Sequence, residues 1–134
     1  EVWATDVLPA ARAGVRLVEL SELLAECDAV TLHVPLTQET RGLIGRNELA
    51  SVRSDALLVN TSRGGVVEAG AVLQALRDGR LGGAALDVLP QEPPPAAPVA
   101  PNLIVTPHAA YYSNAAEALA DRLCIARVRE ILGE

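Results

Sequence analysis

Apolar residues along the chain follow two alternating patterns. Short apolar runs bounded by polar residues, glycine or proline are typical of parallel strands whose two faces are both covered. Between them lie stretches with apolar residues three and four positions apart, the spacing of amphipathic helices. The predicted strands are residues 1–6, 28–35, 56–59, 82–88 and 103–106, and the predicted helices are residues 20–27, 47–52, 68–78 and 113–132. This alternation predicts an α/β fold with a parallel sheet and right-handed crossovers.

Capping residues and prolines set the expected ends of these elements. Ser21 lies where the first helix should begin, and Asn47 can cap the short second helix. Gly79 and Gly133 follow the third and fourth helices as C-terminal caps. Residues 89–101 hold most of the prolines, so we predict a long active-site loop there rather than a regular element.

Composition and charge narrow the class of protein. At 134 residues, half of them hydrophobic, the chain can bury one sizeable core. No apolar stretch reaches the roughly 20 residues that a membrane helix needs, so we predict a soluble, cytoplasmic protein without a membrane partner. The net charge of −6 is spread along the chain and aromatic residues are few, which disfavours direct nucleic-acid binding. Cys27 and Cys124 lack the spacing of metal ligands, so we predict reduced packing residues and no metal site.

Each of the five predicted strands is followed or ended by a residue that could contribute to a ligand-binding site. Because the carboxyl ends of parallel strands meet at one edge of a sheet, we expect these residues to lie along that edge. They are Asp6, Pro35, Arg63, Asp87 and His108. The edge of an open α/β sheet is where ligands bind, so the sequence predicts a site there.

Taken singly, several of these residues have ordinary explanations. Arg63 lies in residues 60–65 (NTSRGG), and from those six residues alone a surface arginine after a strand is the commoner outcome. Asp6 is placed to bond the ribose of a dinucleotide, although an isolated aspartate at a strand end more often forms a turn or caps a helix. For His33, a satisfied histidine near a strand end is preferred over a catalytic one.

An arginine, a histidine and a carboxylate together have a specific chemical use. The guanidinium of Arg63 can bind a substrate carboxylate through two hydrogen bonds. Glu92 lies in the proline-rich loop and can return toward the sheet edge, where a carboxylate would hold His108 in one tautomer for proton exchange. With a nicotinamide as the hydride donor, this set predicts reversible reduction of a 2-oxo acid.

Three motifs, in this order, closely resemble the D-isomer-specific 2-hydroxyacid dehydrogenase family. They are residues 60–65 (NTSRGG), residues 83–88 (GAALDV) with Glu92-Pro93 after them, and residues 102–108 (NLIVTPH). The resemblance covers nearly the whole chain. It implies an NAD-dependent oxidoreductase acting on a small 2-oxo or 2-hydroxy acid. In such an enzyme Arg63 binds the substrate carboxylate, and His108 is the acid/base paired with Glu92.

The resemblance also implies the cofactor contacts and the domain organisation. The implied NAD contacts are Asp6, Val34, Thr40, Thr61, Ser62, Arg63, Asp87 and His108. The family fold is a doubly wound, Rossmann-type parallel sheet, here lacking its first βα unit and the second, substrate-side domain. We therefore expect residues 1–112 to be the C-terminal portion of the NAD-binding domain, and residues 113–134 to be a long helix leading back toward the substrate domain. The full-length protein would be a homodimer, and the isolated 134-residue chain would be inactive.

Two aromatic residues follow the histidine, where the family usually has small ones. Tyr111-Tyr112 is similar to the aromatic pair of the C-terminal binding protein branch, whose animal members are NAD(H)-dependent transcriptional corepressors. Tyr111 would then wall a substrate pocket with Arg63 and His108, or the pair would pack against the last helix. The branch leaves a second hypothesis open, an NAD(H)-sensing interaction module with weak catalysis.

Overall fold

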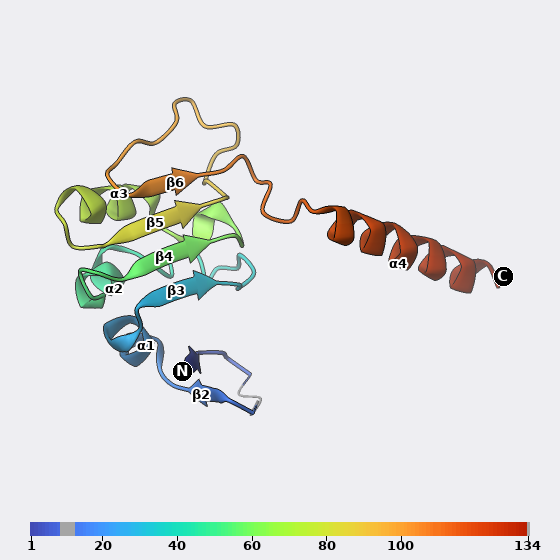
Figure 1. Ribbon diagram of the computed structural model, residues 1–134, viewed down its shortest axis with the longest axis horizontal. Coiled ribbons are helices and arrows are strands. Elements are labelled where there is room, and N and C mark those ends of the chain that lie inside the picture. Colours follow the sequence, from blue (N-terminus) through green and yellow to red (C-terminus); the bar gives the residue numbers. More distant parts are fainter. Residues whose placement is uncertain (9–12, 134) are drawn as a thin grey trace.

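The computed structural model describes residues 1–8 and 13–133. Its main sheet has four parallel strands, in the order β3 (Ala29–Leu32), β4 (Leu57–Asn60), β5 (Gly83–Leu86) and β6 (Leu103–Val105). The register is continuous, so that Thr31, Val59, Ala85 and Ile104 lie side by side across the sheet. All four strands therefore end at the same edge of the sheet (Figure 1).

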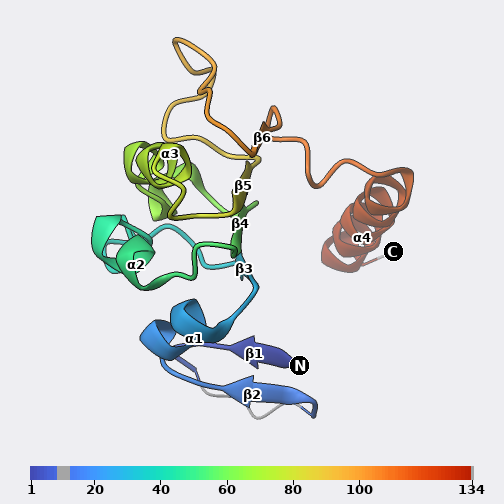
Figure 2. The ribbon, with the colours of Figure 1, turned by 60° about the vertical axis from the view of Figure 1, so that its left-hand side comes forward.

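Three helices cover one face of this sheet (Figure 2). They are α1 (Leu20–Glu26), α2 (Arg46–Ser51) and α3 (Ala69–Arg77). The strand residues that face them form the core, as the neighbouring Val30, Leu58 and Ala84 show, at 5%, 3% and 6% exposed. On the opposite face Leu57 is 50% exposed and Ile104 is 64% exposed. The buried face anchors the strands, and with them the loops at their carboxyl ends.

The two remaining strands form a separate parallel sheet. β1 (Val2–Ala4) pairs with β2 (Val15–Leu17), and in the part of the chain that the structure describes no ladder joins them to β3. The expectation that Asp6 lies at the edge of the main sheet is therefore wrong. β2 was not predicted, because the polar Arg16 interrupts the apolar run between Val15 and Leu17. Arg16 on β2 lies 4.2 Å from the ring centroid of Trp3 and pairs with Glu22 of α1, which links this small sheet to the helices.

Two predicted helix starts are wrong. α1 begins after Glu19 and no side chain caps it, so Ser21 lies inside the first turn. α2 begins after Gly45, and Asn47 is likewise inside the helix. The Gly45 N–H donates to the Glu48 carboxylate at 3.1 Å, so a carboxylate within the helix replaces the expected cap from Asn47.

The last helix, α4 (Asn114–Leu132), has the predicted ends. The Ser113 hydroxyl accepts the N–H of Ala116, and Gly133 takes the left-handed conformation with φ 74°, as Gly79 does after α3 with φ 66°. α4 extends away from the sheet, on the side that α1, α2 and α3 leave bare (Figure 2), and none of its described residues is buried. None of the described helices is both long and apolar enough to cross a membrane.

The cysteines are free thiols in different surroundings. Cys27 is half-buried against the core, and burial raises the pKa of its thiol. Cys124 is exposed on α4, so the predicted packing role is wrong for this residue within the described chain.

Candidate active site

The loop that carries Arg63 is held by a buried amide. The Asn60 side chain ends β4 and is 0% exposed. Its Oδ1 accepts the N–H and the hydroxyl of Ser62 at 3.0 and 2.8 Å, and its Nδ2 donates to the Arg63 carbonyl at 3.1 Å. The Arg63 guanidinium is exposed and donates to the Ser62 carbonyl at 2.7 Å. Asn60 therefore fixes the backbone while the charged end of Arg63 stays accessible to a ligand.

Gly64 lets this loop touch the start of the proline-rich loop. A Cβ at Gly64 would lie 2.0 Å from the carbonyl carbon of Leu89 and 2.5 Å from the nitrogen of Pro90. No side chain fits in that space, so only glycine allows the two backbones to meet. Asn60 and Gly64 are both in the NTSRGG motif, where the glycines are expected to allow a tight turn or a close approach, but the burial of Asn60 and the contact of Gly64 with Leu89 appear only in the fold.

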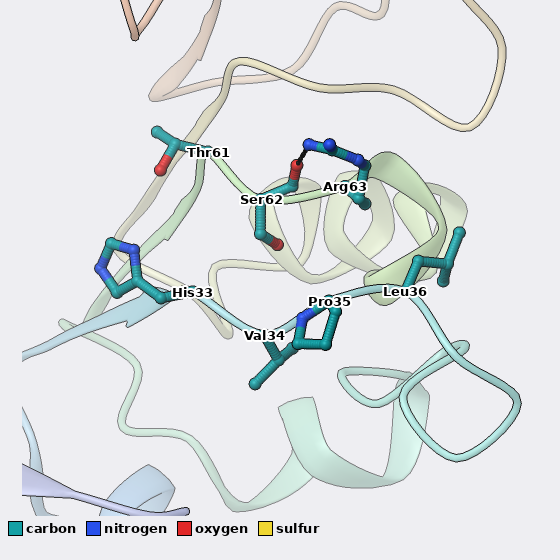
Figure 3. A pocket seen from close by; sticks show the side chains of 7 residues that line it. All are labelled: His33, Val34, Pro35, Leu36, Thr61, Ser62 and Arg63. Atoms are coloured by element: carbon teal, nitrogen blue, oxygen red, sulfur yellow. Dashed lines mark hydrogen bonds between the residues drawn. The ribbon is translucent and has the colours of Figure 1, made fainter. Parts of the chain in front are cut away.

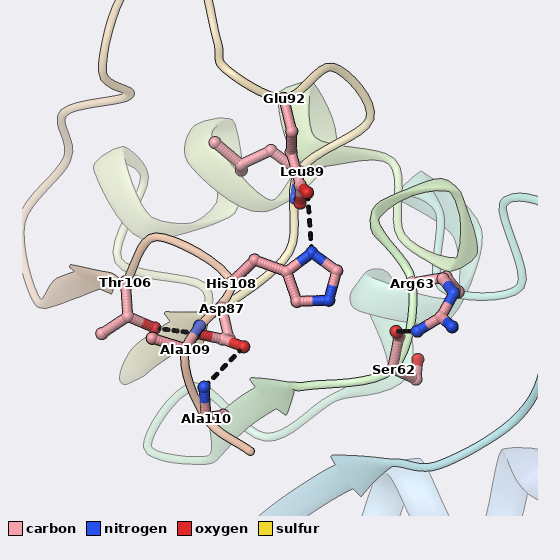
Figure 4. A network of polar contacts seen from close by, with 9 residues as sticks. All are labelled: Ser62, Arg63, Asp87, Leu89, Glu92, Thr106, His108, Ala109 and Ala110. Atoms are coloured by element: carbon pink, nitrogen blue, oxygen red, sulfur yellow. Dashed lines mark hydrogen bonds and ion pairs between the residues drawn. The ribbon is translucent and has the colours of Figure 1, made fainter. Parts of the chain in front are cut away.

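Glu92 and His108 are hydrogen-bonded to each other above the end of β5. Glu92 Oε2 lies 2.8 Å from His108 Nδ1, and Glu92 Oε1 accepts the Leu89 N–H at 2.8 Å (Figure 4). The Leu89 N–H and then the bond to His108 hold the pKa of Glu92 below its ordinary value. An ionised carboxylate only accepts hydrogen bonds, so Nδ1 carries a proton and Nε2 is left for a ligand. Figure 4 shows Nε2 on the side of the ring that faces Arg63.

Asp87 holds the segment on which His108 lies. Its carboxylate is 5% exposed and accepts the Thr106 hydroxyl and the N–H groups of Ala109 and Ala110, the latter two at 2.8 and 3.0 Å. Burial raises the pKa of Asp87, but these donors and the nearby His108 lower it by more, so it lies below the ordinary value. His108 itself has φ 55°, a left-handed conformation that is rare outside glycine. The buried carboxylate thus stabilises a strained turn that presents the histidine.

Arg63 lies between two depressions of the surface. The smaller one, of about 240 Å³, is lined by Glu92, His108, Gly64, Gly65 and the segment 88–90. The larger one, of about 620 Å³, is lined by His33, Val34, Pro35, Thr61 and Ser62 (Figure 3). Arg63 and Leu36 line both. The larger depression has the volume and the mixed apolar and hydroxyl lining of a small-molecule site.

The other predicted cofactor contacts lie apart from these depressions or are engaged within the chain. Thr40 accepts the Thr37 N–H at 2.8 Å and donates to the Pro35 carbonyl at 2.6 Å, so it shapes the loop after β3. Asp6 follows β1, on the separate sheet, where its carboxylate accepts the N–H of Leu8 at 2.9 Å. The structure therefore brings Val34, Thr61, Ser62, Arg63 and His108 to the two depressions, and leaves Asp6, Thr40 and the carboxylate of Asp87 outside their lining.

Three ring side chains near the site, Tyr111, Tyr112 and His33, have defined neighbours in the structure. Tyr111 is 64% exposed, and its ring meets that of His108 edge-on, with centroids 6.5 Å apart. Tyr112 is 63% exposed and lies against Tyr111 at 5.0 Å, so exposure argues against packing of this pair on α4. His33 Nε2 lies 3.0 Å from the Thr31 hydroxyl, which confirms a satisfied histidine near a strand end.

Comparison with known proteins agrees with this geometry. Residues 2–110 match the family described as D-isomer specific 2-hydroxyacid dehydrogenase, NAD binding domain. The chain is 47% identical over 129 residues to the glycerate dehydrogenase of Methylorubrum extorquens, and the match covers 92% of this chain and 40% of that protein. The chain thus spans well under half the length of this curated relative.

Two solved structures with this fold are complexes with nicotinamide cofactors. An acyclic imino acid reductase in complex with NADPH and D-Arg has a TM-score of 0.91 at 27% identity, over 98% of this chain and 43% of that one. The D-lactate dehydrogenase of Lactobacillus jensenii with NAD+ has a TM-score of 0.78 at 30% identity, over 87% of this chain and 40% of that one. These matches confirm the predicted Rossmann-like fold and, at the level of the family, the nicotinamide cofactor. The chain belongs to the D-isomer specific 2-hydroxyacid dehydrogenases and carries the NAD-binding domain of that family.

Proposed function

We propose that this chain supplies the cofactor site and the acid–base pair of an NAD-dependent dehydrogenase that interconverts small 2-oxo and D-2-hydroxy acids. The observation that carries the proposal is the meeting of Arg63, Glu92 and His108 around one depression of about 240 Å³. These residues come from three different loops, and a purely structural domain has no need to gather them at an accessible surface.

Arg63 binds the carboxylate of the substrate in this proposal. Its planar guanidinium can donate two parallel hydrogen bonds to a carboxylate, which fixes the orientation of the adjacent carbonyl group. Its backbone is held by Asn60, and its side chain donates to the neighbouring Ser62 carbonyl, a bond that a substrate can replace. Arg63 therefore combines a fixed position with an available charge.

His108 exchanges the proton. In reduction, protonated His108 gives the Nε2 proton to the carbonyl oxygen, and Glu92 stabilises the positive charge that the ring carries before the transfer. In oxidation the neutral ring takes the proton back from the hydroxyl. A nicotinamide, when bound, would supply the hydride for reduction and accept it in oxidation. Tyr111, edge-on to the ring, would wall the substrate side of the pocket.

The larger depression is the proposed place of the nicotinamide end of the cofactor. Val34, Thr61 and Ser62 line it, and Arg63 joins it to the acid–base pair. Asp6 would bond the adenosine ribose and disfavour a 2′-phosphate, which selects NAD over NADP. Asp87 and Thr40 would act on the cofactor through the loops that they hold.

Several properties of the whole protein stay predictions. They are the identity of the small acid, a cytoplasmic homodimer in the full-length form, and the inactivity of the 134-residue chain on its own. The relatives reported above are named as dehydrogenases and a reductase, which favours the enzyme over an interaction module with weak catalysis.

Substitution of the histidine tests the proposal in the full-length protein. His108→Gln should lower turnover of glyoxylate or hydroxypyruvate by about 10² to 10⁴-fold, because it removes the proton donor. NADH affinity, measured by fluorescence titration, should change little. Arg63→Gln should instead raise KM for the acid. Unchanged turnover in the His108 variant would contradict the role of His108 as the proton donor.

A further inference from the structure

A second arginine lies beside the smaller depression. The segment after β3 runs alongside the loop after β4, since the Gly42 N–H donates to the Gly65 carbonyl at 2.9 Å and the Ile44 N–H donates to the Val66 carbonyl at 3.2 Å. These bonds place Arg41, the residue before Gly42, next to Gly65. Gly65 in turn lines the depression that holds Arg63 and His108.

The charged end of Arg41 reaches the rim of this depression. Its Nη1 lies 3.5 Å from the point that a Cβ of Gly65 would occupy, and the two methyl carbons of Leu36 lie 3.0 and 3.1 Å from the same point. Leu36 and Gly65 both line the smaller depression. The guanidinium therefore lies beside Gly65 and Leu36, two residues that line the depression, although Arg41 is not itself among the lining residues.

Arg41 differs in its partners from the arginines that form ion pairs. Arg16, Arg53 and Arg80 each form an ion pair with a carboxylate, at 2.7 to 2.9 Å. Within residues 1–8 and 13–133 no carboxylate lies within ion-pair distance of Arg41. Its positive charge is therefore available to an anion that enters the depression.

A substrate with two negative charges would need such a group. The chain carries a net charge of −6, which repels anions in general, so local cations must offset that field. Arg63 provides one cation for the carboxylate next to the reacting carbonyl. A second cation at the rim of the same depression can bind a charged group at the other end of the molecule.

We propose that Arg41 is a specificity-determining residue, which binds the distal anionic group of a 2-oxo acid that carries a phosphate or sulfonate in addition to its carboxylate. The proposal rests on the function proposed above. It adds the substrate class, because a 2-oxo acid without a distal charge gains nothing from Arg41.

Two substrates with the same carbon skeleton test it in the full-length protein. Hydroxypyruvate has an uncharged hydroxyl at its far end, whereas its phosphate ester and 3-sulfopyruvate carry an anion there. Arg41→Gln should lower kcat/KM for at least one of the anionic substrates by about tenfold, as expected for loss of one charge-assisted hydrogen bond, and change that for hydroxypyruvate by less than twofold. Arg41→Lys should restore most of the loss, because it keeps the charge.

Arg46→Gln is the matched control. Arg46 is an exposed arginine at the start of α2 and, unlike Arg41, is not among the atoms nearest the Cβ position of Gly65, so its substitution should leave all three kcat/KM values unchanged. Equal losses on hydroxypyruvate and on both anionic substrates, no loss on any substrate, or failure of the unmodified protein to use either anion would each overturn the role of Arg41. If the unmodified protein reduces none of these 2-oxo acids, the proposed function itself fails.

Discussion

Two groups of candidate residues follow strands of this chain, and they are held in very different ways. At the carboxyl ends of β4, β5 and β6, Asp87 bonds residues more than twenty positions away, and Glu92 bonds His108. At the end of β1, the Asp6 carboxylate accepts the N–H of Leu8, two residues further along. The first group is fixed by the fold and the second by its own turn.

This difference matches the demands of the proposed chemistry. Proton transfer needs the donor nitrogen within hydrogen-bond reach of the substrate oxygen, so small displacements of His108 are costly. A ribose contact requires only an acceptor near the end of a strand. The buried hydrogen bonds of Asp87 therefore support the part of the site that holds His108 and Glu92, as expected where a site must be organised before the substrate arrives.

Of the substitutions at the two strand ends, removal of the Asp87 carboxylate should lower stability and turnover the most. Asp87→Ala leaves the Thr106 hydroxyl and two N–H groups without their acceptor, so the free energy of unfolding should fall by about 3 kcal/mol. Turnover should fall as well, because the turn that presents His108 loses its support. Urea denaturation and steady-state kinetics measure the two effects.

Asp78→Ala is the control for that change. Asp78 also bonds side chains, those of Gln74 and Arg80, but on the exposed end of α3 away from the site. It should have a much smaller effect on unfolding and none on turnover. Equal losses in the two variants would show that the buried network at β5 and β6 is not special.

Gly64→Ala should have the next largest effect. The new methyl group would lie 2.0 Å from the Leu89 carbonyl carbon, so the two loops must separate. We expect a loss of about 1 to 3 kcal/mol in unfolding free energy and a fall in kcat/KM, as Arg63 moves away from the acid–base pair. Gly70→Ala is the matched control, since nothing lies within 4 Å of its Cβ position inside α3. It should be neutral or stabilise by up to about 1 kcal/mol. Normal stability and activity of Gly64→Ala would contradict the close approach of the loops.

Local signals predicted much of the molecule. Helix ends at Ser113, Gly79 and Gly133 were predictable because each depends on a few adjacent residues. The meeting of Arg63 and His108 was predictable as well, since parallel strands must end at one edge.

Contacts between distant segments were not predictable in this way. The split into two sheets depends on which strands pair, and the pattern within β1 does not encode its neighbour. Asn60 and Gly64 show their roles only once burial and the approach of Leu89 are known. Arg41 gave no signal, because its place beside Gly65 follows from bonds between two loops.

Low pH should reduce the stability that Asp87 and Glu92 contribute at the ends of β5 and β6, by less than the substitutions above. The pKa values of Asp87 and Glu92 both lie below their ordinary values. Their contribution to stability is therefore complete above the unfolded-state pKa of about 4, and it is lost as the pH falls through the lower folded-state pKa. The difference in unfolding free energy between the unmodified protein and Glu92→Gln should shrink as the pH falls below about 4. A difference that stays constant down to about pH 2 would show that Glu92 contributes nothing through its charge.

The smallest effect on stability should come from Asp6, and that small effect is informative. Asp6→Ala removes one bond, to the neighbouring Leu8 N–H, on an exposed turn of the separate sheet, so unfolding free energy should change by no more than about 0.5 kcal/mol. If Asp6 binds the ribose, the same variant should lose affinity for NADH by about tenfold while its affinity for NADPH holds or rises, because the carboxylate no longer repels a 2′-phosphate. Fluorescence titration with both cofactors measures this ratio. A large loss of stability would instead mean that the turn after β1 supports the fold as Asp87 does, and the contrast between the two strand ends would disappear.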